Sequence, residues 1–349
     1  MKAITIIAGP TAVGKTKFAI EAAKALDGEI VSCDSMQIYK YMDIGSAKPT
    51  EQERLAAKHH LIDMVDPALP FSAAMYQELA KKAIGDIFRR GKVPVVAGGT
   101  GLYLNSLIYD MDFGGPETDP SLHKKLEEEA AEAGPGALYQ RLSVLDRAAA
   151  DRIHPHNTKR VIRALEIAMS GNNLEDFKKC TQKCKDYDIN FIILTRNRPE
   201  LYDRINKRVD LLVEQGLFDE VESLLNRGLT ESDISMKGIG YKEVMGFLHG
   251  RYSREEAIEL IKKNTRRFAK RQITWFRRYE DATWLNISDY QGEEQALGEL
   301  LEWLKKKIRI HNKSDRPDNI IERENNIYMQ CEAIEKELPS FFERILRLS

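Results

Sequence analysis

The sequence predicts an α/β fold in which a P-loop parallel-sheet core is interrupted by a helical insertion domain. Three observations lead to this prediction. The apolar, β-branched stretch 4–8 runs directly into a glycine-rich loop and a helical segment. Strand and helix signals then alternate as far as about residue 110, which is typical of parallel sheets. The pattern next becomes helical and polar, and a strand pattern returns only at 190–195. We therefore expect the core to be discontinuous in sequence.

These changes of pattern set the expected boundaries. Residues 1–110 form the first part of the core, 111–189 the insertion, 190–310 the second part of the core, and 311–349 a tail without an assigned role. Further strands are expected at 29–32, 93–97 and 282–287. In the first part of the core, helices are expected at 17–25 and from the N-cap Ser72 to Arg90. In the insertion they are expected at 122–133, again after Gly136, and at 159–169. In the second part of the core, one helix runs from Pro199 to Gly216 and another follows it to Gly228. The capping box Ser253/Glu256 opens a long basic helix to about Tyr279. Beyond Trp303 we expect weak order, apart from a helix at 330–348.

The glycine-rich loop has P-loop spacing: Gly9, Pro10, Thr11, Ala12, Val13, Gly14, Lys15 and Thr16. Such a loop turns backbone N–H groups toward one anion at a helix N-terminus, where partial positive charge favours phosphate. Lys15 adds a formal charge, and the Thr16 hydroxyl can reach a Mg²⁺ ion that bridges phosphate oxygens. An ordinary strand-to-helix turn is the alternative, which the combination of strand, spacing and helix disfavours. The loop does not reveal which phosphate compound it holds.

Polar residues follow two more expected strands. Asp34 comes directly after the strand at 29–32, and Gly98-Gly99-Thr100-Gly101 follows the strand at 93–97. Catalytic groups of open α/β sheets gather where strands end, so Asp34 and Thr100 should share an edge with Lys15. For Asp34 the sequence leaves two roles open, a general base and a ligand that organises Mg²⁺. Considered alone, 98–101 could be a plain tight turn.

The charge distribution indicates a local phosphate-binding surface. The 349-residue chain has a formal net charge of −1, yet 260–278 contains eight Lys or Arg residues and no acid. Residues 152–165 add four Lys or Arg and two histidines, again without an acid. Two such segments in a near-neutral chain suit contact with a nucleic-acid backbone, although a solvated helix face is the simpler alternative for either one.

Other features of the composition point to a cytoplasmic protein. No apolar run is long enough to cross a bilayer, and Met1-Lys2 leaves no room for a cleavable signal. Four scattered cysteines are expected to remain thiols, and the polar surroundings of Cys180 and Cys184 disfavour a zinc site there. We expect a monomer without membrane contact.

The chain resembles the tRNA dimethylallyltransferase family, also called tRNA isopentenyltransferases, in segments whose order and spacing are kept over roughly the first 305 residues. The matching segments are GPTAVGKT at 9–16, DSMQIY at 34–39, MDIGSAKP at 42–49, GGTGLY at 98–103, IHP at 153–155, RVIRALE at 160–166, GYK at 240–242 and KRQITWFR at 270–277. One departure is His123, which stands where the family usually has arginine. The tail beyond residue 310 lies outside the resemblance.

The resemblance implies transfer of a dimethylallyl group from dimethylallyl diphosphate to N6 of the adenosine just 3′ of the anticodon in tRNA. The P-loop and Arg208 would then hold the diphosphate, with Mg²⁺ at Thr16 and Asp34. Asp34 would be the general base, with Thr100, Lys15 and Thr16 also catalytic. Contacts to the tRNA anticodon stem-loop would come from Asp34, Ser35, Met36, Gln37, Thr100, His123, Lys159, Arg160, Arg163, Lys242, Lys270, Arg271, Gln272 and Arg277.

Two other classes of function remain open on the sequence. A P-loop small-molecule kinase would share the loop and the helical insertion, but it would form ADP and would need no basic RNA-binding segments. A non-catalytic nucleotide switch that binds RNA would need neither Asp34 nor Thr100, so its function would tolerate their substitution.

Overall fold

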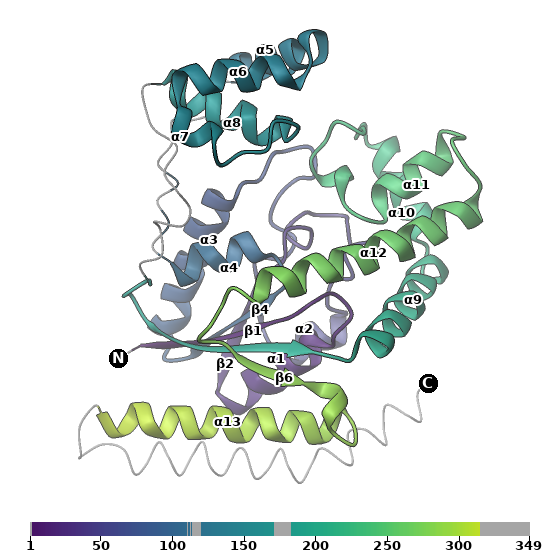
Figure 1. Ribbon diagram of the computed structural model, residues 1–349. Coiled ribbons are helices and arrows are strands. Elements are labelled where there is room, and N and C mark those ends of the chain that lie inside the picture. Colours follow the sequence, from purple (N-terminus) through teal and green to yellow (C-terminus); the bar gives the residue numbers. More distant parts are fainter. Residues whose placement is uncertain (1, 110, 112, 114–119, 171–182, 315–349) are drawn as a thin grey trace. The chain divides into compact units, whose positions relative to one another are not determined.

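The computed structural model of the protein describes residues 2–109, 111, 113, 120–170 and 183–314. Within them the core is a six-stranded, fully parallel sheet of order β3-β2-β4-β1-β5-β6 (Figure 1). The strands are β1 (Ala3–Ala8), β2 (Gly28–Cys33), β3 (His59–His60), β4 (Val93–Gly98), β5 (Asp188–Thr195) and β6 (Thr283–Asn286). This confirms the predicted α/β fold class.

The strand register aligns the carboxyl ends of the central strands. Gly98 at the end of β4 pairs with both Ala8 of β1 and Cys33 of β2. The segments that follow these three strands therefore leave the sheet at one edge. They are the P-loop, the turn at Asp34 and the glycine-rich turn at 99–101.

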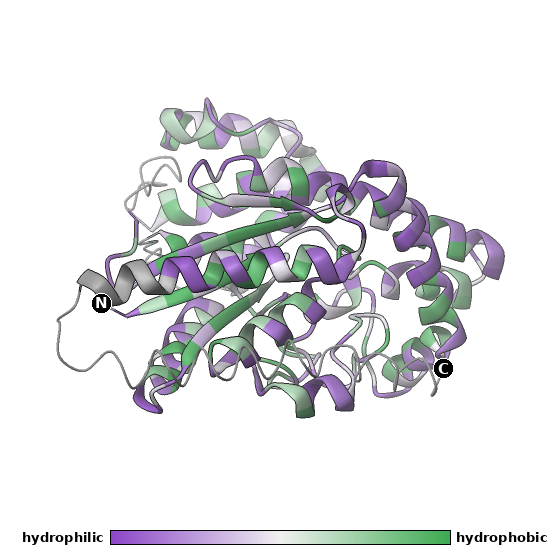
Figure 2. Ribbon diagram, turned by 90° about the horizontal axis from the view of Figure 1, so that it is seen from below, coloured by the Kyte–Doolittle hydropathy of each residue, from purple (hydrophilic) through white to green (hydrophobic). Residues whose placement is uncertain are grey.

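Helices cover both faces of the sheet (Figure 1). α1 and α13 lie on one face, and α3 and α4 lie on the other. Figure 2 shows the apolar strands with α13 running across them. The helices of the core unit are α1 (Lys15–Ala25), α2 (Glu51–Ala56), α3 (Ala73–Arg89), α4 (Gly101–Ile108), α9 (Arg198–Glu214), α10 (Leu217–Asn226), α11 (Tyr241–Leu248), α12 (Arg254–Phe276) and α13 (Glu293–Ser314), with 3₁₀ turns η1 (Ser235–Lys237) and η2 (Ile287–Asp289).

The expected helix caps are present, and one expectation about helix extent is wrong. Ser72 caps α3, and Ser253 with Glu256 forms the capping box of α12. Weak order was expected beyond Trp303, yet α13 continues to Ser314. Its first half buries Leu297, Leu300 and Leu304 in the same core cluster as α1 and the central strands, which stabilises the helix by tertiary packing rather than by local propensity.

The chain divides into two compact units, 1–108 with 185–349, and 109–184. The second unit contains α5 (Pro120–Ala133), α6 (Pro135–Leu145), α7 (Arg147–Ala150) and α8 (Thr158–Met169) around a core of its own. An antiparallel bridge between Tyr109 and Lys183 joins the two ends of this unit. α6 begins at Pro135 rather than after Gly136, because proline suits the first turn of a helix.

Several expectations fall on other parts of the chain. The helix at 330–348, the tail 315–349, Cys180 and Cys331 lie outside the described residues. Cys33 and Cys184 are buried free thiols, as expected. In the described part of the chain, no helix combines the length and the apolar character needed to cross a membrane.

Candidate active site

The P-loop joins β1 to α1 at the carboxyl edge of the sheet. Gly14 is the N-cap of α1 and has φ of 112°, a left-handed conformation that suits glycine because a β-carbon would be strained there. Lys15 begins the helix, and its Nζ donates to the carbonyl of Pro10 at 2.9 Å. The loop therefore carries its ammonium group beside the free N–H groups of a helix N-terminus, the arrangement that favours phosphate.

Two arginines outside the loop hold its backbone. Arg196 Nε donates to the carbonyl of Val13 and Arg204 Nε to that of Ala12, each at 3.0 Å. Both guanidinium groups also pair with Glu293 at the start of α13. Sequence reasoning missed this support because the partners are far apart in the chain. The one available signal was the position of Arg204, off the apolar face of α9.

Asp34 and Thr100 lie close together where β2 and β4 end. Asp34 Oδ1 accepts from the backbone N–H of Met36 at 2.9 Å. Thr100 Oγ1 accepts from the N–H of Ser35 at 3.0 Å and lies 3.4 Å from the Ser35 hydroxyl. These bonds orient the Asp34 carboxylate and hold the Thr100 hydroxyl against Ser35, the residue after Asp34. Ser35 and Met36 are half-buried on the same turn.

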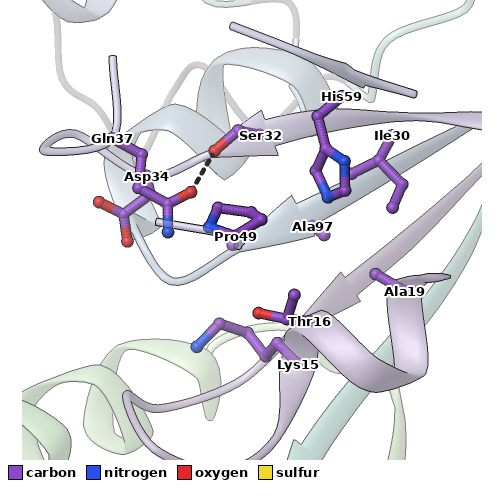
Figure 3. Close-up of a pocket in the computed structure, with 11 residues that line it drawn as sticks. Lys15, Thr16, Ala19, Ile30, Ser32, Asp34, Gln37, Pro49, His59 and Ala97 are labelled. Carbon is purple, nitrogen blue, oxygen red and sulfur yellow. Dashed lines mark hydrogen bonds between the residues drawn. The ribbon is translucent and has the colours of Figure 1, made fainter. Parts of the chain in front are cut away.

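A pocket brings these groups to opposite sides of one space. Lys15 and Thr16 line one side, and Asp34 and Gln37 line the other (Figure 3). The same pocket is lined by residues that sequence reasoning did not select, namely Ala19, Ile30, Ser32, Pro49, His59, Ala97 and Gly98. Four of these are apolar, so a charged group and a short hydrocarbon can be held side by side.

Electrostatics make the Lys15 end of the pocket ready for an anion. Burial lowers the pKa of Lys15 from 10.5 to about 8, and Asp34 opposes this effect while Arg208 adds to it. Burial also lowers the pKa of Arg208, again against the influence of Asp34. Two half-buried cations beside one carboxylate are incompletely compensated, and a bound diphosphate would supply negative charge.

His59 is a further pocket residue that the sequence did not reveal. Burial lowers its pKa below 6.5, so the ring is neutral at pH 7. Its Nδ1 lies 2.7 Å from the carbonyl of Ala57, which can only accept, so Nδ1 carries the proton and Nε2 is left as an acceptor. Nothing in the sequence around His59 marked it, because β3 is only two residues long.

Two amide side chains expected to contact tRNA form hydrogen bonds within the protein. Gln37 accepts from Ser32 Oγ at 3.0 Å and donates to the carbonyl of Ala47 at 3.2 Å. Gln272 is only 6% exposed; it accepts from the N–H of Thr11 at 2.9 Å and donates to the carbonyl of Gly99 at 2.9 Å. Gln37 thus forms a wall of the pocket, and Gln272 joins the P-loop to the 99–101 turn. The contacts predicted between these side chains and tRNA stay predictions.

Basic side chains expected to contact tRNA lie on the surface of α11 and α12. Lys242 of α11 is exposed, with its Nζ 3.6 Å from Glu243. On α12 the exposed basic residues recur at helical spacing and form what we call the α12 stripe: Lys263, Arg267, Lys270 and Arg271. Arg277 is exposed just beyond the helix.

The basic residues of the insertion differ among themselves. Lys159 and Arg160 on α8 are exposed. His123 Nδ1 and Arg163 Nη1 both contact the buried Glu166, at 2.6 and 3.1 Å. His123, which replaces the arginine usual in the resembled family, is therefore partly engaged within its own unit.

The parallel sheet, the loop register and the pocket define a P-loop α/β protein with a carboxylate facing the phosphate loop. Comparison with known proteins makes this specific. A family model described as IPP transferase matches residues 37–279, which is more than half of the chain. The chain belongs to this family.

Similar proteins support the same conclusion. A tRNA dimethylallyltransferase of Alkaliphilus oremlandii is 53% identical over 84% of this chain and 94% of its own, and one of Clostridioides difficile is 48% identical over 88% and 98%. The crystal structure of a tRNA isopentenylpyrophosphate transferase from Bacillus halodurans is 42% identical, covers 90% of this chain and 99% of its own, and has a TM-score of 0.68. A eukaryotic dimethylallyltransferase described as acting on tRNA is 29% identical over 83% of this chain and 75% of its own, with a TM-score of 0.70.

The lowered pKa of Lys15 leads to a prediction about proton uptake. With a pKa of about 8, a large share of Lys15 amines is neutral at pH 8.5, and a bound diphosphate anion should restore the charged form. Binding of dimethylallyl diphosphate should therefore take up clearly more protons through Lys15 at pH 8.5 than at pH 7, where Lys15 is already mostly charged. Affinity should fall as the pH rises above 8. Calorimetry in two buffers of different ionisation enthalpy measures the uptake.

The variant Lys15→Arg stays charged over this range, so its uptake at pH 8.5 should be close to zero. Lys24→Arg, a change of the same kind near the other end of α1, is the control and should behave as the unmodified protein does. Equal uptake by Lys15→Arg and the unmodified protein would assign the proton to another group.

Proposed function

We propose that the protein transfers a dimethylallyl group from dimethylallyl diphosphate to N6 of the adenosine adjacent to, and 3′ of, the anticodon in tRNA, and releases diphosphate. Family membership supports this activity, as do relatives named tRNA dimethylallyltransferase at about half identity. A structural neighbour described as acting on tRNA supports the polynucleotide acceptor.

The observation that carries the proposal is the mixed character of the pocket. Lys15 and Thr16 stand at its phosphate side, and Ala19, Ile30 and Ala97 add apolar surface to the same space. An allylic diphosphate has the same two parts, a charged group and a five-carbon chain. The carboxylate of Asp34 faces this space from the opposite side, where an acceptor nitrogen would approach.

The P-loop binds the leaving diphosphate. Backbone N–H groups at the start of α1, together with Lys15 and Arg208, surround the diphosphate with positive charge. As the allylic C–O bond breaks, negative charge grows on the leaving oxygen, and these fixed groups stabilise it more strongly than they stabilise the ground state. Arg208 Nη2 also lies 3.5 Å from the carbonyl of Ala47, which orients the guanidinium.

Asp34 acts as the general base. The adenine amine is a poor nucleophile because its lone pair is delocalised into the ring. A carboxylate can accept its proton once the nitrogen becomes cationic during C–N bond formation. In the balanced step the N6–C bond forms, the C–O bond breaks, the proton moves to Asp34 and the electron pair leaves with diphosphate. Thr100, held next to Asp34 through Ser35, positions the amine.

The residues present also fit Mg²⁺. Thr16 and Asp34 offer a hydroxyl and a carboxylate, the hard oxygen donors that this ion prefers. Among the described residues there is no group of three His, Cys, Asp or Glu that could form a cage, so diphosphate oxygens and water would complete the coordination. When bound, the ion would neutralise charge on the diphosphate.

Each unit offers exposed cations for the tRNA backbone. Lys159 and Arg160 lie on α8 of the insertion, and Lys242 and the α12 stripe lie on the core unit. The acceptor base must leave the stacked loop to reach Asp34, since the pocket opens at the edge of the sheet. Gln37 is held by Ser32 and Ala47, so it shapes the wall that the base meets.

A P-loop small-molecule kinase is the second candidate of the sequence, and the comparisons do not favour it. The two functions differ in their products. Incubation with labelled dimethylallyl diphosphate and unmodified tRNA should place the label in tRNA, release diphosphate and require no ATP. Formation of ADP with each turnover would instead show that the P-loop serves a nucleotide.

The role of Asp34 can be separated from metal binding. Asp34→Asn keeps the size of the side chain but removes its proton affinity, so the single-turnover rate should fall by roughly a hundredfold or more. Binding of tRNA should stay near that of the unmodified protein. Asp66→Asn, at an exposed acid outside the pocket, is the matched control. Recovery of the rate by raised Mg²⁺ would show that Asp34 organises the ion and would remove it from the base role.

The α12 stripe should contribute to tRNA binding through phosphate contacts. Lys270→Ala with Arg271→Ala should weaken tRNA binding and reduce the slope of log affinity against log salt by about one for each lost contact. Affinity for dimethylallyl diphosphate should hardly change. Lys306→Ala with Lys307→Ala, an exposed pair on α13, is the control. An unchanged salt slope in the α12 double variant would mean that its cations face solvent only.

A further inference from the structure

A short loop after β2 fixes two groups of the pocket. This 42–48 loop presents the carbonyl of Ala47, which accepts from Gln37 Nε2 at 3.2 Å and lies 3.5 Å from Arg208 Nη2. Gln37 lines the pocket, and Arg208 is a half-buried cation whose pKa is influenced by Asp34. A shift of the Ala47 carbonyl would therefore displace a wall and a charge of the pocket together.

The 42–48 loop is not held by its own conformational preference. Ala47 has φ of 47°, in the left-handed region that costs a non-glycine residue about 1 kcal/mol or more. Two bonds inside the loop, from Ala47 N to the Ile44 carbonyl and from Lys48 N to the Asp43 carbonyl, make it compact. Such a conformation persists only when its surroundings stabilise it, so contacts with neighbouring residues must hold the loop.

One neighbour, Glu220 on α10, collects an unusual number of donors from the loop. Its Oε2 accepts from the N–H groups of Asp43 and Ile44, each at 2.7 Å, and its Oε1 accepts from that of Gly45 at 2.9 Å. The Tyr241 hydroxyl donates to Oε1 at 2.8 Å. Three consecutive backbone N–H groups thus converge on one carboxylate, a charge-assisted arrangement.

Packing and charge around the loop agree with this contact. Tyr241 is fully buried, and a β-carbon on Gly45 would lie 2.6 Å from its ring, so the loop can approach only as glycine. At the other end of the loop, Lys48 is buried and bonds to the Tyr39 carbonyl, Asp43 and Asp63. Lys48 anchors that end, and Glu220 anchors the turn at 43–45.

We propose that Glu220 is a positioning residue, which sets Arg208 and Gln37 for the diphosphate donor by holding the 42–48 loop. The inference rests on the proposed function for its substrate. It adds a residue that touches neither the donor nor the reacting atoms. Its effect reaches the pocket through the backbone of the loop and ends at the Ala47 carbonyl.

The test is Glu220→Gln, which keeps the shape but turns an amide NH₂ toward backbone N–H groups that need an acceptor. The dissociation constant for inorganic diphosphate should rise about tenfold or more, and kcat/KM for dimethylallyl diphosphate should fall by at least as much. The dissociation constant for tRNA should stay within about twofold. Glu222→Gln, at an exposed acid two residues along α10, is the matched control and should leave all three constants unchanged.

Calorimetry with inorganic diphosphate needs no acceptor, so this result stands even if the transfer reaction were assigned wrongly. Where Glu220→Gln does not fold, Tyr241→Phe carries the test. It removes one of the four bonds and should give a smaller loss of diphosphate affinity of the same kind. Unchanged diphosphate affinity in a folded variant, or equal losses for diphosphate and tRNA, would overturn the proposal.

Discussion

A buried amide, Gln272 on α12, makes the connection on which the site depends. It bonds to the N–H of Thr11 in the P-loop and to the carbonyl of Gly99 in the neighbouring turn. Both backbone groups lie beyond the ends of their strands, where the sheet no longer provides partners. Leaving such groups buried and unpaired costs about 1–3 kcal/mol each, so this one side chain favours a fixed distance between the two turns.

The same helix therefore has two different faces. Gln272 and, one turn along, Trp275 face the loops, and the indole lies so close to Gly101 that no β-carbon would fit there. The α12 stripe occupies the exposed side. Because a helix is stiff along its length, α12 would position the tRNA phosphates on its exposed side and the diphosphate beside the P-loop relative to each other. A rigid helix fixes this distance more closely than flexible loops would.

Local pattern was enough to predict five of the six strands, the P-loop and the edge at which Asp34 and Thr100 meet, because each depends on neighbours in the sequence and on the geometry of parallel strands. It did not reveal the two-residue strand β3 or the internal bonds of Gln272, Glu220 and Glu293. A glutamine that reads a base and a glutamine that bonds to backbone look alike in sequence. The second reading depends on partners such as Thr11, which is 261 residues away from Gln272. The start of the α13 extension was missed for the same reason, since Leu304 belongs to the core cluster that also contains residues of α1 and the central strands.

The contacts that a P-loop makes to a diphosphate are the same whatever group is attached to the diphosphate. Selection of a prenyl donor must therefore come from the remaining walls of the pocket. Burial of five carbon groups at about 0.8 kcal/mol each supplies up to about 4 kcal/mol, close to a thousandfold in affinity. The same walls have a second consequence. Positive charge develops on the hydrocarbon as the C–O bond breaks, and water competes with the amine for it. Under the proposed function, apolar surface from Ile30, Pro49 and Ala97 would disfavour water there, so the walls that select the donor would also favour transfer over hydrolysis.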